Sequence, residues 1–233
     1  MKNQGKGIFV IGSTGPAGEA LCRLLAATGE QLVVMHRSDK RRAEFEAMGC
    51  RVVSGDAMNR EETFAAINSV AGDCDRVVSL IGGSPLNDPS TWPDYTGNVN
   101  ATDAAIAAGI RRFILVTSIG TGASFRYTPE TSITRPILQL KTRAEDYLRA
   151  TDLDWSIVMP GGLGKPGSVP KSGAPLLTEN EAVRGSIDRD ELAALIAKVV
   201  RDNSGRTTGK RLLAAAVNIQ VFDGEATPFE LPA

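Results

Sequence analysis

The sequence predicts an α/β protein built on one doubly wound, mostly parallel β-sheet. Short apolar runs rich in branched residues alternate with amphipathic stretches along most of the chain. Such alternation gives a parallel sheet with helices on both faces, because parallel neighbours need a crossover connection. The 233 residues suffice for one such domain. We therefore expect a single domain, residues 1–233, with the strand order 3-2-1-4-5-6.

The individual elements follow from the spacing of apolar residues. The predicted strands are Gly7–Ile11, Gln31–His36, Arg51–Ser54, Arg76–Ile81, Arg112–Thr117 and Trp155–Met159, with a possible seventh strand near Arg211–Ala215. The predicted helices are Ala17–Thr28, Lys40–Met48, Arg60–Asn68, Asn98–Ala108, Pro136–Ala150 and Asp188–Arg201. Apolar residues recur every three or four positions in the helical stretches, as they do on one face of an α-helix. Asp188 is placed to cap the last helix.

Composition and charge exclude several classes of function. A formal net charge of −1 argues against general affinity for nucleic acid or for anionic membranes. Three separated cysteines and the single histidine, His36, give neither a disulfide framework nor a metal site. No targeting segment precedes the first strand, and no apolar run is long enough to insert into a membrane. We expect a cytoplasmic monomer or homodimer that binds a small-molecule substrate.

The first motif is a glycine-rich turn between the first predicted strand and the first predicted helix. It reads Gly12, Ser13, Thr14, Gly15, Pro16, Ala17, Gly18. Glycines allow the backbone to turn tightly and to approach a pyrophosphate, whose charge the helix N-terminus stabilises. The turn therefore predicts a Rossmann-type dinucleotide site, although a purely structural glycine turn is the alternative.

The end of the second strand indicates which dinucleotide is bound. A domain that prefers NAD usually carries an acidic residue there, which binds the ribose 2′-hydroxyl. This chain instead has Arg37, followed by Ser38 and further cations. A guanidinium and a hydroxyl suit a 2′-phosphate, so we expect NADP(H). The alternative is a solvated basic helix start, with Asp39 as its cap.

Two further strand ends should border the cofactor cleft. Asp56 and Ala57 follow the third strand, where they could meet the adenine. Leu80, Ile81, Gly82 and Gly83 end the fourth strand, where the glycine backbone could lie along the ribose. A simple turn is the alternative for the glycine pair.

Taken with later segments, these motifs resemble a known family. The further segments are Arg111–Thr121, Lys141–Glu145 and Leu153–Gly162. In this order they resemble the atypical short-chain dehydrogenases with an NAD(P)H-binding domain. That group includes biliverdin/flavin reductases, NmrA-like regulators and NADP-binding proteins of chloroplasts and cyanobacteria.

The resemblance implies site residues position by position. It places Ser118, after Thr117, beside the nicotinamide, and Lys141 at the nicotinamide ribose, and we treat both as candidate catalytic residues. It also implies a loop that closes over the nicotinamide, formed by Pro160, Gly161, Gly162 and Leu163. The expected substrate-side region comprises residues 84–94, 123–135 and 160–187.

One departure from the family affects the chemistry. Main-branch members use Tyr-x-x-x-Lys, whose tyrosine donates or accepts the proton. Four residues before Lys141 this chain has Ile137, and nothing in the sequence places Tyr127 in the site. The leading hypothesis is an NADP(H)-dependent oxidoreductase that transfers hydride to a conjugated acceptor of the flavin, quinone or bilin type. The alternative is a non-catalytic NADP(H) sensor or scaffold, and a nucleotide-sugar epimerase is a third possibility.

Overall fold

The structure is a computed structural model that describes residues 6–84 and 86–231. The main sheet has eight strands in the order β3-β2-β1-β4-β5-β6-β9-β7. The predicted order 3-2-1-4-5-6 is therefore confirmed, and the possible seventh strand is β9, which pairs in parallel with β6. Pro85 of the predicted substrate-side region, and both ends of the predicted domain, lie outside the described residues.

The elements have the following bounds. The strands of the main sheet are β1 (Gly7–Ile11), β2 (Leu32–His36), β3 (Arg51–Ser54), β4 (Cys74–Ser79), β5 (Arg112–Val116), β6 (Asp154–Pro160), β7 (Leu176–Thr178) and β9 (Lys210–Ala215). The α-helices are α1 (Pro16–Ala27), α2 (Arg42–Ala47), α3 (Arg60–Asn68), α4 (Thr96–Ala107), α5 (Arg135–Arg149) and α6 (Arg189–Arg201). Three short 3₁₀ helices are η1 (Asp39–Arg41), η2 (Pro89–Thr91) and η3 (Gly122–Tyr127).

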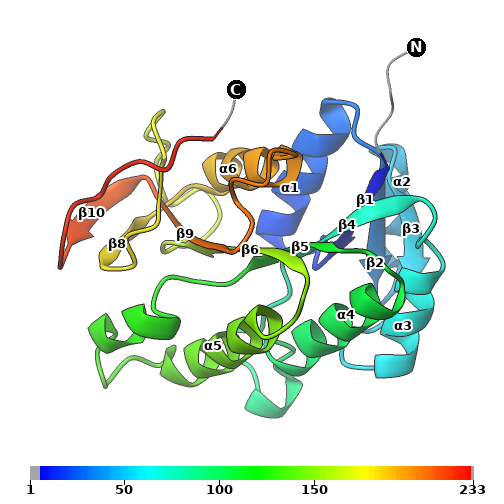
Figure 1. Ribbon diagram of the computed structural model, residues 1–233, viewed down its shortest axis with the longest axis horizontal. Helices are drawn as coiled ribbons and strands as arrows, with labels where there is room; N and C mark the ends of the chain where they lie inside the picture. Colours follow the sequence, from blue (N-terminus) through cyan, green and yellow to red (C-terminus); the bar gives the residue numbers. More distant parts are fainter. Residues whose placement is uncertain (1–5, 85, 232–233) are drawn as a thin grey trace.

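Helices cover both faces of the sheet. Figure 1 shows α1 and α6 above the sheet and α3, α4 and α5 below it. Alternate side chains of each strand reach opposite faces, so that Val10 of β1 packs toward α1 whereas Phe9 belongs to the cluster with α3 and α4. Both residues are fully buried, as expected for a strand in the middle of a doubly wound sheet.

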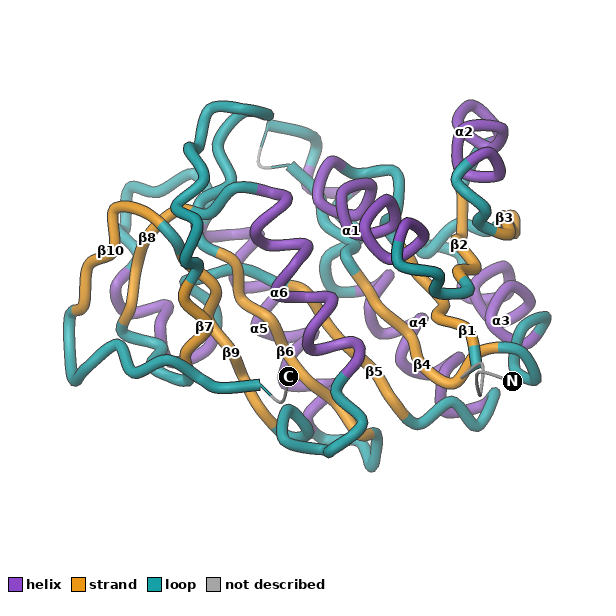
Figure 2. Tube along the Cα trace, turned by 90° about the horizontal axis from the view of Figure 1, so that it is seen from above, coloured by secondary structure: helices purple, strands orange, loops and turns teal. Residues whose placement is uncertain are grey.

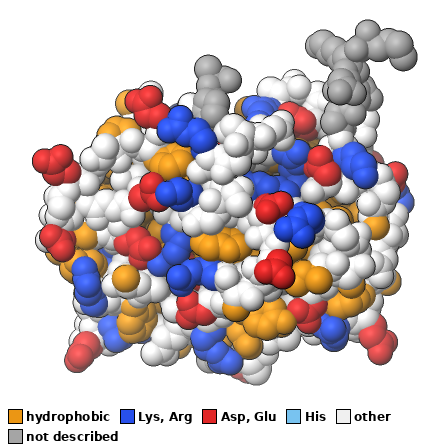
Figure 3. All heavy atoms as spheres, in the orientation of Figure 1, with side chains coloured by type: hydrophobic (Ala, Val, Ile, Leu, Met, Phe, Trp, Pro, Cys, Tyr) orange, Lys and Arg blue, Asp and Glu red, His pale blue; other side chains and the backbone are white. Residues whose placement is uncertain are grey.

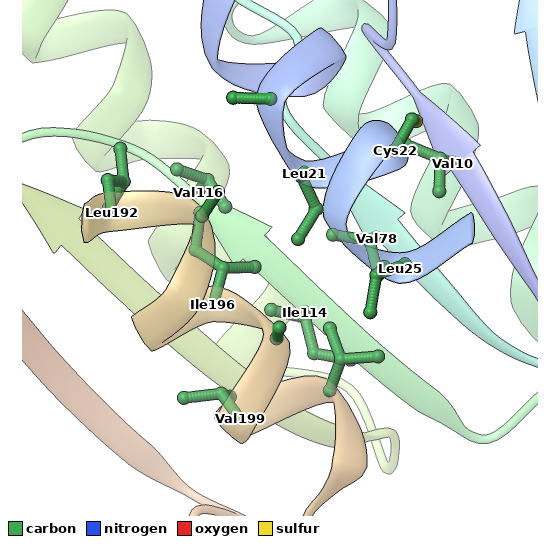
Figure 4. Close-up of a cluster of buried hydrophobic side chains, with 14 of the residues drawn as sticks. Val10, Leu21, Cys22, Leu25, Val78, Ile114, Val116, Leu192, Ile196 and Val199 are labelled. Carbon is green, nitrogen blue, oxygen red and sulfur yellow. The ribbon is translucent and has the colours of Figure 1, made fainter. Parts of the chain in front are cut away.

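The upper core shows how helical spacing builds this packing. Leu21 and Leu25 of α1 lie four residues apart on one face and are 0% exposed. Figure 4 shows them beside Val78 and Ile114 of the sheet, with Ile196 of α6 completing the cluster. Burial of each leucine side chain contributes about 1.5–3 kcal/mol to stability. The Asp188 side chain caps α6 by accepting a hydrogen bond from the Asp190 N–H, as the sequence predicts.

The chain after β6 forms more strands than the sequence predicts. β7 pairs antiparallel with β9, and a separate antiparallel pair is formed by β8 (Val183–Ser186) and β10 (Val217–Val221). None of these three strands is predicted from apolar periodicity. Figures 1 and 2 place this pair beyond β9, at the end of the molecule that lies farthest from β3.

The face shown in Figure 3 carries no large patch of a single charge sign. On the face shown in Figure 3, lysine and arginine side chains are interspersed with carboxylates, in keeping with the formal net charge of −1. In the described part of the chain, no helix has the length and apolar character needed to cross a bilayer.

Candidate functional site

A first cavity of about 300 Å³ lies where β1, β2, β3 and β4 end. The predicted cofactor residues that line it are Gly12, Thr14, Gly15, Arg37, Asp56, Ala57, Leu80, Ile81 and Gly82. Parallel strands bring their carboxyl ends to one edge of the sheet, which is why segments so distant in sequence meet here. Asp56 is held by the N–H group of Met58, which donates to its carboxylate at 2.9 Å.

The glycine-rich turn has a shape that only glycine permits at two positions. Gly12 has φ of +85°, and a Cβ there would lie 2.7 Å from the Leu80 carbonyl group. A Cβ on Gly18 would lie 2.2 Å from the Gly12 carbonyl oxygen. The first turn of α1 therefore packs directly against the loop that leaves β1, and Gly15, the N-cap of α1, lines the first cavity.

The basic segment after β2 divides into paired and unpaired cations. Arg41 binds Glu19 and Glu44 and donates to the Thr14 carbonyl, while Arg42 binds Asp39. Within residues 6–84 and 86–231, Arg37 has no such partner and instead lines the first cavity. The expectation that Asp39 caps a helix is wrong, because Asp39 begins η1 and its carboxylate accepts from Arg42.

His36 is the last residue of β2 and is 2% exposed. Its ring lies edge-on against Phe45 of α2, and neither ring nitrogen has a hydrogen-bond partner in the described part of the chain. Burial, and then the charges of Arg42 and Arg41, lower the pKa of His36. The imidazole is thus a neutral packing group beneath the basic segment, because a charged ring there would be desolvated and repelled.

A second cavity of about 480 Å³ begins where the first one ends. Gly82 lines the first cavity and Gly83 the second, so the two spaces adjoin along the segment after β4. Ser118 and Lys141 both line the second cavity, as does Gly162. The Ser118 hydroxyl takes part in none of the hydrogen bonds found among the described residues, whereas its carbonyl accepts from Thr121.

Lys141 is held by a carboxylate that the sequence analysis did not single out. Its Nζ lies 2.7 Å from Oδ1 of Asp94, whose side chain is 0% exposed. The other oxygen of Asp94 accepts a hydrogen bond from the Gly83 N–H at 2.8 Å. Asp94 therefore ties the α5 lysine to the backbone at the end of β4. The sequence does show an acidic residue just before α4, but no local sequence pattern indicates that this residue pairs with Lys141.

The position that a tyrosine occupies in the main-branch dehydrogenases is apolar here. Ile137 is 5% exposed and, with Leu138, forms part of the wall beside Lys141. Tyr127, at the end of η3, lines the same cavity, although it lies fourteen positions before Lys141 in the chain. The phenol comes from the segment 123–135, which the sequence assigns to the substrate side without placing Tyr127 itself in the site.

Thr117 and its neighbours form a buried polar network behind Ser118. The Thr117 hydroxyl donates to Glu145 at 2.6 Å, and Arg211 of β9 donates to the second oxygen of that carboxylate at 2.7 Å. Glu145 is 1% exposed, and burial raises the pKa of its carboxyl group. Arg211 also binds Glu181, in the turn before β8. The network joins the end of β5 to α5, β9 and that turn.

The segment after β6 is more constrained than a free loop. Pro160 is the last residue of β6, and Gly162 donates to the Gly185 carbonyl of β8 at 2.9 Å. Leu163 packs against the hydrophobic cluster between the sheet and α1 and α6. The predicted cofactor residues outside both cavity linings are Ser13, Pro16, Ala17, Gly18, Ser38, Thr117, Pro160, Gly161 and Leu163.

These features fit a nicotinamide dinucleotide. The close packing of Gly12 and Gly18 leaves the α1 N-terminus open toward the first cavity, where an anion would be stabilised. The unpaired Arg37 lines the first cavity, and the pair Asp94–Lys141 lies beside Gly82 and Gly83, where the two cavities adjoin.

Comparisons with known proteins agree with this fit. Over 193 residues the chain is 30% identical to the uncharacterised sugar epimerase YhfK of Bacillus subtilis, covering 81% of this chain and 85% of YhfK. It is 28% identical over 218 residues to the chloroplastic protein TIC 62 of Pisum sativum, of which it spans 40%. Among solved structures, the anaerobillin reductase ChuY of Escherichia coli O157:H7 superposes with a TM-score of 0.79 at 25% identity, over 92% of this chain and 98% of ChuY.

The family assignment rests on a longer match. Residues 12–203 match the family described as NAD(P)H-binding, a span that runs from the glycine-rich turn to the end of α6. Together with the relatives above, this match confirms the resemblance to atypical short-chain dehydrogenases and the expectation of a nicotinamide cofactor. The chain belongs to the NAD(P)H-binding family.

Proposed function

We propose that the protein is an NADP(H)-dependent oxidoreductase that reduces a small, conjugated acceptor. The observation that carries the proposal is the second cavity, in which Ser118 and Lys141 face a largely apolar wall directly beyond the cofactor cleft. A reduced nicotinamide supplies a hydride, which is two electrons with one proton, and the acceptor takes its second proton from a hydroxyl group or from water.

The cofactor preference rests on Arg37. A 2′-phosphate placed in the first cavity would meet an unpaired guanidinium, and a charge-assisted contact of this kind strengthens binding by about 1.5–3 kcal/mol. Arg41 and Arg42 are already neutralised by carboxylates and contribute to the shape of the segment instead. NADP(H) is therefore favoured over NAD(H).

The roles of the site residues follow from their contacts. Lys141, fixed by Asp94, holds a positive charge and three donors beside the segment after β4, where a ribose hydroxyl can be oriented. Ser118 offers an unengaged hydroxyl just after β5, and Tyr127 offers a phenol, which accepts from Arg126, in the lining of the same cavity. We assign Ser118 as the first candidate proton donor.

The apolar Ile137 favours an acceptor that needs no strong enzymic acid. A simple ketone develops alkoxide charge during reduction, and loss of a positioned acid slows such a step by about 10²–10⁴-fold. A flavin, quinone or bilin spreads the incoming charge over its own conjugated system. The structural neighbour ChuY is an anaerobillin reductase, which supports an acceptor of the bilin type.

The second candidate function is a non-catalytic NADP(H) sensor or scaffold. Two observations favour it. Ile137 stands where a tyrosine could donate a proton, and no histidine or carboxylate of the described residues lines the second cavity to take over that role. Under this hypothesis Ser118 and Lys141 would bind the cofactor and would not act on a substrate.

Oxidation of NADPH by the purified protein, measured against a panel of flavins, quinones, bilins and simple aldehydes, separates the two functions. We expect turnover of at least one conjugated acceptor and about 10²-fold weaker activity on aldehydes. Ser118→Ala and Tyr127→Phe, each checked for unchanged NADPH affinity, identify the proton donor. Tight NADPH binding without reduction of any acceptor would favour the sensor.

A further inference from the structure

Arg184 of β8 carries a charge that no carboxylate neutralises. Its guanidinium donates to the carbonyl oxygens of Val183, at 3.0 Å, and of Ser124. None of the ion pairs formed within the described ranges of the chain includes Arg184. The acid nearest in sequence, Glu181, binds Arg211 through Oε1 at 2.6 Å, while its Oε2 atom has no hydrogen-bond partner in the described part of the chain. Arg184 reaches only the backbone carbonyl oxygen of Glu181, at 3.5 Å, and forms no ion pair with its carboxylate.

An unpaired guanidinium is unusual in this environment. Arg184 is half-buried, and burial lowers the pKa of its guanidinium, which nevertheless stays charged near neutral pH. Desolvated charges in proteins are normally paired, because backbone carbonyls only partly replace the lost hydration. By contrast, Arg211, on the neighbouring strand β9, has two carboxylate partners.

The second cavity, which Arg184 lines, has no acidic group in its lining among the described residues. Its two cations are Lys141 and Arg184, and the charge of Lys141 is already balanced by Asp94 at 2.7 Å. The net electrostatic character of the cavity is therefore set by Arg184. A substrate with a negative group would gain a partner there without displacing any internal ion pair.

An aromatic side chain, Tyr127, lies next to Arg184 in the second cavity. The Arg184 guanidinium lies 5.4 Å from the centre of the Tyr127 ring, which lines the same cavity. Phe222 stacks on Tyr127 at 5.1 Å and 20°. The Arg126 guanidinium donates to the Tyr127 hydroxyl at 2.7 Å and also lies over the Tyr127 ring, 4.7 Å from its centre. A planar π-system can lie against such rings while a charged substituent reaches the guanidinium.

We infer that the second cavity takes a planar, anionic acceptor, one that carries a carboxylate or a comparable acidic group, and that Arg184 anchors this group. The inference rests on the proposed function and narrows its substrate class. Ser118 and Lys141 lie at the cofactor end of the cavity, and Arg184 and Tyr127 bind the charged and flat parts of the ligand. Neutral conjugated compounds lack the anchoring contact.

A fluorescence titration tests the anion site without any turnover. The probes are 8-anilinonaphthalene-1-sulfonate and its neutral counterpart N-phenyl-1-naphthylamine, added to protein saturated with NADP⁺. We expect the wild-type protein to bind the sulfonate at least about tenfold more tightly than the amine, because a charge-assisted contact is made only with the former. Equal affinities would overturn the inference.

Matched variants locate the contact. Arg184→Gln should weaken sulfonate binding about tenfold and leave the amine unchanged, whereas Arg184→Lys should retain part of the preference. The control is Arg206→Gln. Arg206 is exposed, unlike the half-buried Arg184, but it too lies over an aromatic ring, that of Phe229, and it is outside the second cavity. Circular dichroism and NADPH affinity verify that each variant is folded. A loss in Arg206→Gln equal to that in Arg184→Gln would assign the effect to net charge and overturn the inference.

Steady-state kinetics separates this inference from the proposed function. Biliverdin and its dimethyl ester share one conjugated system and differ in their carboxylates. We expect KM for the acid to rise about tenfold in Arg184→Gln and kcat to change little, because anchoring acts on binding. Efficient reduction of the ester at an equal KM would refute the anion site while leaving the oxidoreductase intact. Selective anion binding without any reduction would refute the oxidoreductase and leave the anion site intact.

Discussion

The two cavities that meet at Gly82 and Gly83 are built in different ways. The first is formed largely by backbone at the ends of β1 to β4, where α1 packs against the loop that follows β1. The second is formed by side chains from segments far apart in the chain, among them Ser118, Lys141 and Arg184. A backbone-built site binds a constant group such as a phosphate, whereas a side-chain-built site can change its ligand by single substitutions.

The two sides also differ in what fixes them. On the cofactor side, the decisive contact is steric, between Gly18 and the Gly12 carbonyl. On the substrate side, it is a buried ionic network in which Glu145 and Arg211 connect four segments. The cofactor side should therefore be destabilised most by substitutions that add atoms, and the substrate side by substitutions that remove a charged partner.

The largest expected effect comes from removing the centre of the ionic network. Glu145→Ala leaves the Thr117 hydroxyl without its acceptor and removes one of the two carboxylates of Arg211. We expect the free energy of unfolding to fall by about 3 kcal/mol. This is the lower end of the cost of breaking a buried ion pair, because Glu181 still balances the charge of Arg211. Urea denaturation measures this loss. Glu44→Ala, which removes an exposed carboxylate paired with Arg41, is the control and should change stability by less than about 1 kcal/mol.

Overpacking on the cofactor side should be slightly less severe. A Cβ on Gly18 would lie 2.2 Å from backbone oxygen, so Gly18→Ala should lower the free energy of unfolding by about 2–3 kcal/mol. It should also weaken NADPH binding, because α1 must shift. Gly15→Ala is the matched control, since its Cβ would lie 3.5 Å from the Gly12 oxygen, an ordinary contact. Equal stability losses in the two variants would show that the tight approach at Gly18 has no special role.

These contrasts explain how much the sequence could predict. The central strands of the sheet are buried on both faces, so they read as apolar runs, and the glycine-rich turn is contiguous in sequence. By contrast, β8 reads VRGS and β10 is largely exposed, so neither has an apolar period. Asp94, Tyr127 and Arg184 lie in the segments expected on the substrate side, but their individual contacts arise from long-range packing. No local pattern of residues could indicate that Asp94 meets Lys141.

Replacing Arg37 should change cofactor affinity by a free energy smaller than the stability losses expected for Glu145 and Gly18 variants. Arg37→Ala should weaken NADPH binding by about 10- to 100-fold and leave NADH binding unchanged, since only NADPH carries the 2′-phosphate. Isothermal titration calorimetry with both cofactors measures the change. Lys40→Ala removes a like charge from a neighbouring exposed position and should change NADPH affinity by less than about threefold. A wild-type protein with equal affinities would contradict the assignment of Arg37.

The smallest expected effect lies at Asp202, which lines neither of the two site cavities and whose replacement should affect stability alone. Burial by itself would raise the pKa of its carboxyl group, but hydrogen bonds from Ser204 and Thr207 outweigh burial and lower that pKa from 3.8 to about 2. Because the folded state binds the proton less tightly than the unfolded state, the contribution of Asp202 is fully present above the unfolded pKa and is lost as the pH falls toward the folded value.

Asp202→Asn should therefore lower the free energy of unfolding near pH 7 by about 1–2 kcal/mol, after allowance for solvent screening. The difference from the wild-type protein should shrink as the pH is lowered from about 5 to about 3, because protonation removes the same charge from the wild-type carboxylate. Urea denaturation at these pH values measures the trend, and NADPH affinity near neutral pH should be unaffected. A stability difference that stays constant with pH would mean that Asp202 stabilises the turn through hydrogen-bond geometry and that its charge contributes nothing.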